Sequence, residues 1–370
     1  MQLPDSPAAV KFYIQHSDKD SVATDQIPER IEVGMRAKYH LLNQRKDKNM
    51  TKVSPPFKLD IAGAFCVPRA LRDARGQYQD GQMSRQALRA IEDAEIRNLV
   101  ERLKLAGVRV VSDGGFRNGD FLVNWEGIRA KDDRPFSEGA ALEITRRIGL
   151  QQHPVFEDFT FLISVAGDEV VSKQHLPSPA EVMTQILQRV DRGELEAVYP
   201  DIRLLTDDIA AGYKVLLGQL YEAGCRYIQF DGVHSVVMED TIRLNNRVLR
   251  ECPEGMYIAF HAPTEMLIQL HGADAYFLNY DCGSCDRNRL LWFLHEKEAV
   301  FGFVLSRYPH EDELDELQAK TESVLNYIPL KRFTLCLPDA NALASPSDAD
   351  EKEQWETVRL GMLMAERIFS

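Results

Sequence analysis

Polar and ionisable side chains stand at the ends of short apolar runs along this chain of 370 residues. Asp231 follows the run YIQF and His261 follows YIAF, so an acid and an imidazole occupy equivalent positions in two successive runs. A histidine beside an aspartate can act as a general base, because imidazole titrates near neutral pH. We therefore take Asp231, His261 and the nearby His234 as candidate catalytic residues. Candidate substrate-binding residues near other such ends are Asp113, Arg117, His175, Asn279 and Asp339.

Arg117 follows the segment VRVVSDGGF and carries a fixed positive charge. A guanidinium group can hold a carboxylate or a phosphate through two parallel hydrogen bonds. Arg117 is therefore a candidate for binding an anionic group of a substrate. The alternative is a salt bridge to Asp113 or Asp120 that only ties down the loop.

The segment CGSC supplies Cys282 and Cys285 with the spacing that zinc sites use. Together with His261 and His234, these thiols could surround a zinc ion. A single pair of cysteines without a matching second pair is weak evidence, however, because isolated thiols are common in reduced proteins. We expect no metal site and keep zinc at these cysteines as the less favoured alternative.

The elements that position these residues alternate, from residue 57 onward, between apolar β-branched runs and long helical patterns. This alternation is typical of βα units around a parallel sheet. Eight such units predict an α/β fold of the (β/α)8 TIM-barrel type, in which the chemistry sits at the C-terminal ends of the strands. The expected strands are 59–65, 108–114, 170–176, 226–232, 256–262, 275–281, 300–306 and 333–339.

Helix ends can be predicted at several places. Ser84 is the expected N-cap of the helix that begins SRQALRAIEDAEI, and Gly107 is its expected end.

The segment FEDFTFLISVAGDEVV (156–171) is interpreted as an extra hairpin before the third strand, and 118–155 as a long excursion over the barrel top. An open doubly wound sheet is disfavoured, because no strand leads into a glycine-rich dinucleotide fingerprint.

Residues 1–55 differ from the rest by polar stretches such as HSDKDSVATDQIPER. We predict a poorly ordered N-terminal extension over 1–55 and a barrel domain over 57–370. Met50 is a second candidate start of translation, so the hypothesis is that residues 1–49 extend the gene model beyond the native protein.

The composition limits the kinds of partner. With 44 Lys and Arg against 57 Asp and Glu, the net charge is −13, which repels nucleic acid and anionic membrane surfaces. No apolar run approaches the length of a membrane helix, and the N-terminus lacks a secretory signal pattern. We expect a cytoplasmic protein with reduced cysteines and a small-molecule substrate; the sequence leaves the oligomeric state open.

Seven segments that follow one another along the chain can be compared with known families: SRQALRAIEDAEIRNLVERLKLAGVRVVSDGGFRNGDF, KQHLPSP, YIQFDGVHSVVMED, IAFHAP, YFLNYD, PLKRFTLCLPDA and EKEQWETVRLGMLMAERIF. In this order they resemble the cobalamin-independent methionine synthase family, specifically its short single-barrel members. The resemblance covers about residue 57 to the C-terminus. It implies the same barrel and, for the family, transfer of a methyl group from a methylfolate to the thiol of homocysteine, held as a thiolate by zinc.

Most of the family's zinc ligands are replaced in this chain. The family uses a His, two Cys and a Glu, and only the His has a match, His261. Pro263, Asn279 and Ala340 stand at the other three positions. Proline and alanine cannot ligate through their side chains, and a neutral amide is a poor zinc ligand.

The positions that hold homocysteine in the family are altered as well. Ala64 and Gly115 replace the family's Ser and Glu, whereas Asp231 matches the Asp that binds the amino group. A site built for hydrogen bonds rejects ligands that leave its polar groups unpaired, so a changed set of polar groups indicates a changed substrate.

The expected function is thus a methionine-synthase-like methyl- or alkyl-transferase that acts on an acceptor other than homocysteine. The zinc site is degenerate, and a methylfolate-like donor is unidentified. Two alternatives stay open: a metal-free acid/base enzyme of the decarboxylase or lyase type, by analogy with the barrel of uroporphyrinogen decarboxylase, and a non-catalytic ligand-binding barrel.

Overall fold

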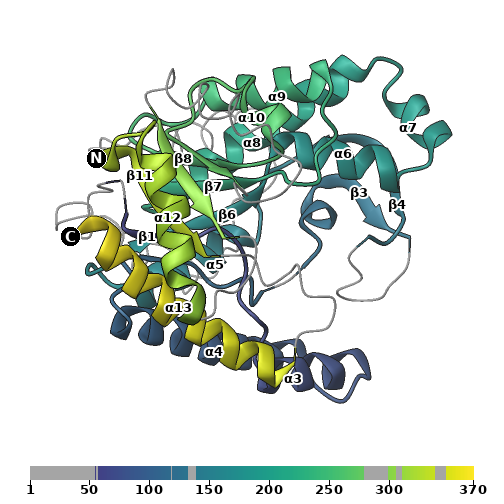
Figure 1. Ribbon diagram of the computed structural model, residues 1–370. Coiled ribbons are helices and arrows are strands. Elements are labelled where there is room, and N and C mark those ends of the chain that lie inside the picture. Colours follow the sequence, from purple (N-terminus) through teal and green to yellow (C-terminus); the bar gives the residue numbers. More distant parts are fainter. Residues whose placement is uncertain are drawn as a thin grey trace, which may run out of the picture. The chain divides into compact units, whose positions relative to one another are not determined.

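The computed structural model describes residues 55, 57–117, 119–131, 139–278, 299–305, 311–337 and 347–370 (Figure 1). All of them lie in one unit, Thr51–Ser370. The predicted extension 1–55 falls outside the described residues apart from Pro55. The predicted site residues Asn279, Cys282, Cys285 and Asp339 also lie outside them.

Seven parallel strands form a curled sheet, and their residues are almost all buried. Parallel strands are buried on both faces because crossover helices cover the outside, which explains their nearly continuous apolar sequences. Neighbouring strands run level at their C-terminal ends, so that Asp231 lies beside His261. In sheet order the strands are β1 (Leu59–Ile61), β11 (Phe333–Leu337), β10 (Val300–Val304), β9 (Ala275–Leu278), β8 (Tyr257–His261), β7 (Tyr227–Asp231) and β6 (Gln174–Pro177).

The remaining short strands continue this arrangement beyond β6. The strand β2 (Val110–Val111) pairs in parallel with β5 (Val171–Ser172). Lys173 separates β5 from β6, and its backbone N–H donates to the carbonyl of Val111 at 2.8 Å. The N–H of Phe65, just after β1, donates to the carbonyl of Gly114, just after β2, at 2.9 Å. A closed barrel needs β2 between β1 and β5; closure of all eight strands stays a prediction.

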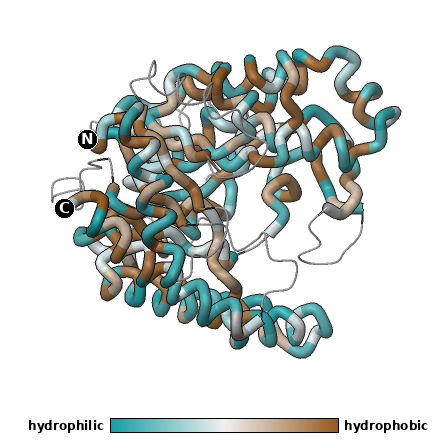
Figure 2. Tube along the Cα trace, viewed as in Figure 1, coloured by the Kyte–Doolittle hydropathy of each residue, from teal (hydrophilic) through white to brown (hydrophobic). Residues whose placement is uncertain are grey.

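Helices follow most of the strands and pack against one another outside the sheet (Figure 1). Hydrophobic and hydrophilic stretches alternate along the long helices α4 and α13, as expected for helices with one face on the core (Figure 2). The helices are α3 (Arg69–Gln79), α4 (Arg85–Leu105), α5 (Val155–Ala166), α6 (Pro179–Arg189), α7 (Arg192–Val198), α8 (Ile202–Glu222), α9 (Glu239–Arg250), α10 (Thr264–Leu267), α12 (Leu314–Leu325) and α13 (Asp348–Phe369).

Both predicted ends of α4 are confirmed. The Ser84 hydroxyl accepts a hydrogen bond from the Ala87 N–H at 3.1 Å, and Gly107 follows the helix with φ +85°. Within the described residues, no helix combines the length and the apolar character that crossing a bilayer demands.

The predicted hairpin over 156–171 is wrong, because the structure has the helix α5 over most of this segment. Its buried residues Val155, Phe159, Leu162 and Ala166 recur at helical spacing, and Gly167 ends it with φ +66°. The antiparallel hairpin lies earlier, within the segment predicted as a long excursion. It consists of β3 (Glu126–Ala130) and β4 (Leu142–Gly149).

Candidate functional site

Three predicted site residues meet at the C-terminal ends of neighbouring strands. Asp231 ends β7, His261 ends β8, and His175 lies in β6. The carboxylate lies between the two imidazoles: His175 Nδ1 is 2.9 Å from Asp231 Oδ2, and His261 Nδ1 is 3.9 Å from Asp231 Oδ1. Because parallel strands end at the same edge of a sheet, their sequence positions suffice to bring these side chains together.

The environment of Asp231 keeps its carboxyl group ionised. Burial alone would raise the pKa of Asp231. The hydrogen-bonded His175 lowers this pKa, and His261 and a hydrogen bond from Gln229 lower it further. The net shift of the pKa is downward. About a third of the side chain, 34%, remains exposed. The rim therefore presents an accessible negative charge beside two imidazoles.

Asp113 lies in the loop after β2 and interacts electrostatically with His175, and its pKa moves in the opposite direction to that of Asp231. Burial raises the pKa of Asp113. Two smaller effects lower this pKa: the Gly115 N–H donates a hydrogen bond to Asp113 Oδ1 at 3.0 Å, and His175 interacts with the carboxyl group electrostatically. Two carboxyl groups with pKa values displaced in opposite directions can divide the roles of proton donor and anion. Asp113 and Asp231 each interact electrostatically with His175, and their pKa values are displaced in the opposite directions that such a division needs.

Arg117 has acidic partners of its own on the helices α4 and α5. Its side chain is only 2% exposed, and the guanidinium pairs with Asp93 of α4 and lies 3.4 Å from Asp158 of α5. It also lies over the ring of Phe161, with 4.3 Å from the guanidinium carbon to the ring centroid. These ion pairs differ from the alternative given above, a salt bridge to Asp113 or Asp120, because the side chain reaches between α4 and α5. The pairs with Asp93 and Asp158 tie down the loop after β2.

The other predicted residues are not part of this cluster within the described structure. His234 is exposed in the loop between β7 and α9 and forms no hydrogen bond or ion pair with another described residue. Asn279, Asp339, Cys282 and Cys285 lie outside the described residues, so their predicted roles stay predictions.

Four polar residues that sequence reasoning missed lie directly behind the rim. Lys173, Asp60, Gln229 and Tyr227 are buried inside the curled sheet, among apolar side chains such as Phe277. A charged or amide side chain in the middle of an apolar strand, as in VVSKQHL, LDIAG and YIQFD, was the available signal. Burial of such groups requires partners, so a partner set could have been expected.

The zinc ion that the resemblance implies can be tested against the residues present. His261 occupies the matched position, but Pro263 is the N-cap of α10 and offers no side-chain ligand. Across the described ranges, no group of three or more His, Cys, Asp or Glu could hold a metal ion. This donor set does not fit zinc, and we derive no chemical step through a metal.

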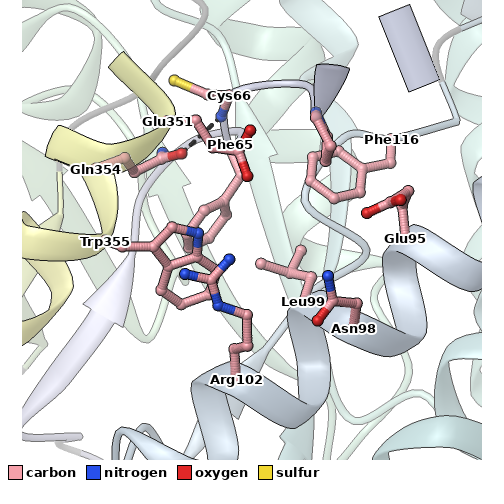
Figure 3. Close-up of a pocket in the computed structure, with 11 residues that line it drawn as sticks. Phe65, Cys66, Glu95, Asn98, Leu99, Arg102, Phe116, Glu351, Gln354 and Trp355 are labelled. Carbon is pink, nitrogen blue, oxygen red and sulfur yellow. Dashed lines mark hydrogen bonds between the residues drawn. The ribbon is translucent and has the colours of Figure 1, made fainter. Parts of the chain in front are cut away.

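A small pocket lies elsewhere, between α4 and α13 (Figure 3). The Arg102 guanidinium carbon lies 3.5 Å from the centre of the Trp355 ring, and the Cys66 N–H donates to Gln354 Oε1 at 2.7 Å. None of the predicted site residues lines it. We therefore take the rim around Asp231, and not this pocket, as the candidate site.

Comparison with known sequences places the chain beside two relatives of undefined activity. No family model matches it. The uncharacterized proteins YxjG and YxjH of Bacillus subtilis (strain 168) are each 26% identical to it. The alignment with YxjG covers 85% of this chain and 95% of YxjG, and that with YxjH covers 82% and 92%.

Comparison with solved structures links the fold to methionine synthases. A Listeria monocytogenes protein named as a candidate vitamin-B12-independent methionine synthase superposes with a TM-score of 0.69 and 26% identity, over 85% of this chain and 98% of the other. A B12-independent methionine synthase from Shewanella sp. W3-18-1, in complex with selenomethionine, superposes with a TM-score of 0.60 and 15% identity. The superposition covers 85% of this chain and 98% of the other, and at this identity it shows likeness of fold alone. The chain is therefore similar to methionine-synthase-like proteins.

Proposed function

We propose that this protein is a methyl- or alkyl-transferase of the methionine-synthase type that acts on an acceptor other than homocysteine. The observation that carries the proposal is the ionised, partly exposed carboxylate of Asp231 between two imidazoles at the rim. We assign to Asp231 the cationic amino group of the acceptor. The likeness to the Listeria monocytogenes protein supports the reaction class.

The residues around Asp231 support a different acceptor. Gly115 has no side chain with which to hold an amino acid, and its backbone N–H binds Asp113 instead. Ala64 likewise lacks the hydroxyl of the family's serine. With these contacts absent, the rim retains the contact to an amino group but not the full set that suits homocysteine.

His175 is the residue best placed to accept a proton from the acceptor. An ionised carboxylate only accepts hydrogen bonds, so His175 Nδ1 must carry the hydrogen that it shares with Asp231. In the neutral ring, this leaves the lone pair on Nε2, which has no hydrogen-bond partner among the described residues. Asp231 thereby fixes the tautomer in which Nε2 is basic, and Nε2 would deprotonate the attacking group of the acceptor.

Calorimetry with matched ligand pairs tests the role of Asp231. L-methionine and 4-(methylthio)butanoate differ only in the amino group, as do S-methylcysteine and 3-(methylthio)propanoate. We expect the amine of a pair to bind about 10- to 100-fold more tightly, because a charged hydrogen bond is worth about 1.5–3 kcal/mol. In Asp231→Asn this preference should disappear.

The exposed His234 provides the matched control, since it lies in the loop after the same strand but outside the cluster. His234→Ala should keep the preference for the amine. Equal binding of amine and deamino ligands by the unaltered protein would contradict the proposal.

A further inference from the structure

The buried side chain of Lys173 connects the strand β1 to the rim. Its ammonium group donates to Asp60 Oδ1 at 2.6 Å, to Gln229 Oε1 at 2.9 Å and to the carbonyl of Ile61. Its side chain is 0% exposed and that of Asp60 is 1% exposed. Three donor hydrogens thus meet three acceptors, and the ammonium is fully satisfied.

This arrangement determines which way the Gln229 amide points. A lysine ammonium can only donate, so the amide oxygen of Gln229 must face it. The amide nitrogen then donates to Asp231 Oδ1 and to the carbonyl of Ala62, each at 2.6 Å. A flipped amide would place oxygen against two acceptors and NH2 against an ammonium, so three favourable contacts would become unfavourable.

The charge of Lys173 is compensated locally and not by Asp231. Asp60 accepts from the ammonium through one oxygen and from the Tyr227 hydroxyl, at 2.5 Å, through the other. The Lys173–Asp60 pair is therefore close to neutral as seen from the rim. Lys173 therefore affects Asp231 through the orientation of the Gln229 amide and not through a net charge.

We propose that Lys173 is a positioning residue, which orients the Gln229 amide and thereby the carboxylate of Asp231 toward the acceptor. The inference rests on the proposed role of Asp231 in binding the amino group. Lys173 itself has no access to a ligand at the rim, because its side chain is wholly buried.

The test uses a double variant, Lys173→Met with Asp60→Asn. The methionine removes the donors, and the asparagine avoids an unpaired buried carboxylate, which would be strongly destabilising. Tyr227→Phe is the matched control, because it removes a hydrogen bond to the same Asp60 but none to Gln229. Gln229→Met identifies the Gln229 side-chain amide signals in nitrogen-15 NMR spectra by their absence.

In the unaltered protein, the Gln229 amide hydrogens should exchange slowly with solvent and resonate downfield. In the double variant, we expect exchange at least tenfold faster and at least a tenfold loss of the preference for L-methionine over 4-(methylthio)butanoate. Tyr227→Phe should keep both values within twofold. If Lys173 had a merely structural role, the double variant and Tyr227→Phe would both be less stable, but they would not differ in amide exchange or in the preference for L-methionine.

Each outcome decides a separate point. Rapid amide exchange in the unaltered protein overturns the proposal even if no variant folds. Unchanged exchange and preference in the folded double variant also overturn it. If the unaltered protein shows no preference for the amine, the proposed function fails, while the amide exchange still shows whether Lys173 orients Gln229.

Discussion

At the scale of single residues, the rim combines a stable anion with a carboxyl group that resists ionisation. Asp231 is flanked by two imidazoles and an amide donor, whereas burial dominates at Asp113. His175 interacts with both carboxyl groups, and we propose that its Nε2 accepts the proton of the acceptor.

Asp113 should lower the stability of the fold at neutral pH. Its folded pKa is raised above the ordinary 3.8 by burial, so the folded state binds the proton more tightly than the unfolded state. Stability is then lost as the pH rises from the ordinary pKa through the raised one. We expect Asp113→Asn, which can still accept from the Gly115 N–H, to raise the free energy of unfolding at pH 7.

Urea unfolding at several pH values measures this effect. The gain from Asp113→Asn should shrink as the pH falls and vanish below about pH 4, where both forms of the side chain are neutral. The same substitution at the exposed Asp80 is the control for deleting one carboxylate. A gain that is constant across the pH range would show that burial of the charge is not its cause.

At the scale of elements, the sequence predicted what depends on local pattern. Strand runs, the caps of α4 and the meeting of Asp231 with His261 follow from spacing and from the common edge of parallel strands. The segment 156–171 was predicted as a hairpin, because its aromatic and branched residues outweighed the helical recurrence of its apolar positions. Lys173 and Gln229 were missed because their partners, apart from Asp231, lie on other segments of the chain.

Arg117 illustrates the same limit, since its partners come from two helices that the sequence does not place together. Asp158 accepts from Arg117 and, at 2.5 Å, from Arg89, so the carboxylate would keep one cation if Arg117 were lost. We expect Arg117→Ala to lower the free energy of unfolding by about 2–3 kcal/mol, somewhat less than for a fully buried pair. Denaturant unfolding measures it.

The exposed pair of Arg129 with Glu143, at 3.1 Å in the hairpin, is the matched control. Arg129→Ala should cost less than about 1 kcal/mol, because solvent screens an exposed pair. If Arg117→Ala left stability unchanged and only weakened the binding of anionic ligands, the role in binding a substrate would be the correct one.

At the scale of the whole molecule, the fold is similar to that of methionine-synthase-like proteins over 85% of the chain. Asp231 and His261 lie at adjoining strand ends of this fold. The sequence resemblance implies that positions which a zinc-bound thiolate would need are replaced. Such a combination is expected where a scaffold is retained and the substrate has changed, as we propose.

The metal content of the purified protein distinguishes a site with zinc from a site without a metal before any acceptor is known. Zinc needs three or four good ligands at about 2.0–2.3 Å, and the sequence resemblance implies that only His261 remains of the family's ligands. We expect elemental analysis of protein purified without chelators or added metal to find well under one zinc per chain. The same preparation should form no methionine from homocysteine and a methylfolate, because no thiolate-activating zinc is held.

Stoichiometric zinc would contradict this expectation and point to ligands outside the matched positions, of which Cys282 and Cys285 are the first to test. Replacing both by serine should then release the metal, since serine hydroxyls do not substitute for thiolates at a zinc ion. If zinc is absent and methionine is nevertheless formed, the thiol must be activated by protein groups alone. His175→Gln, which removes the basic Nε2, would then abolish turnover.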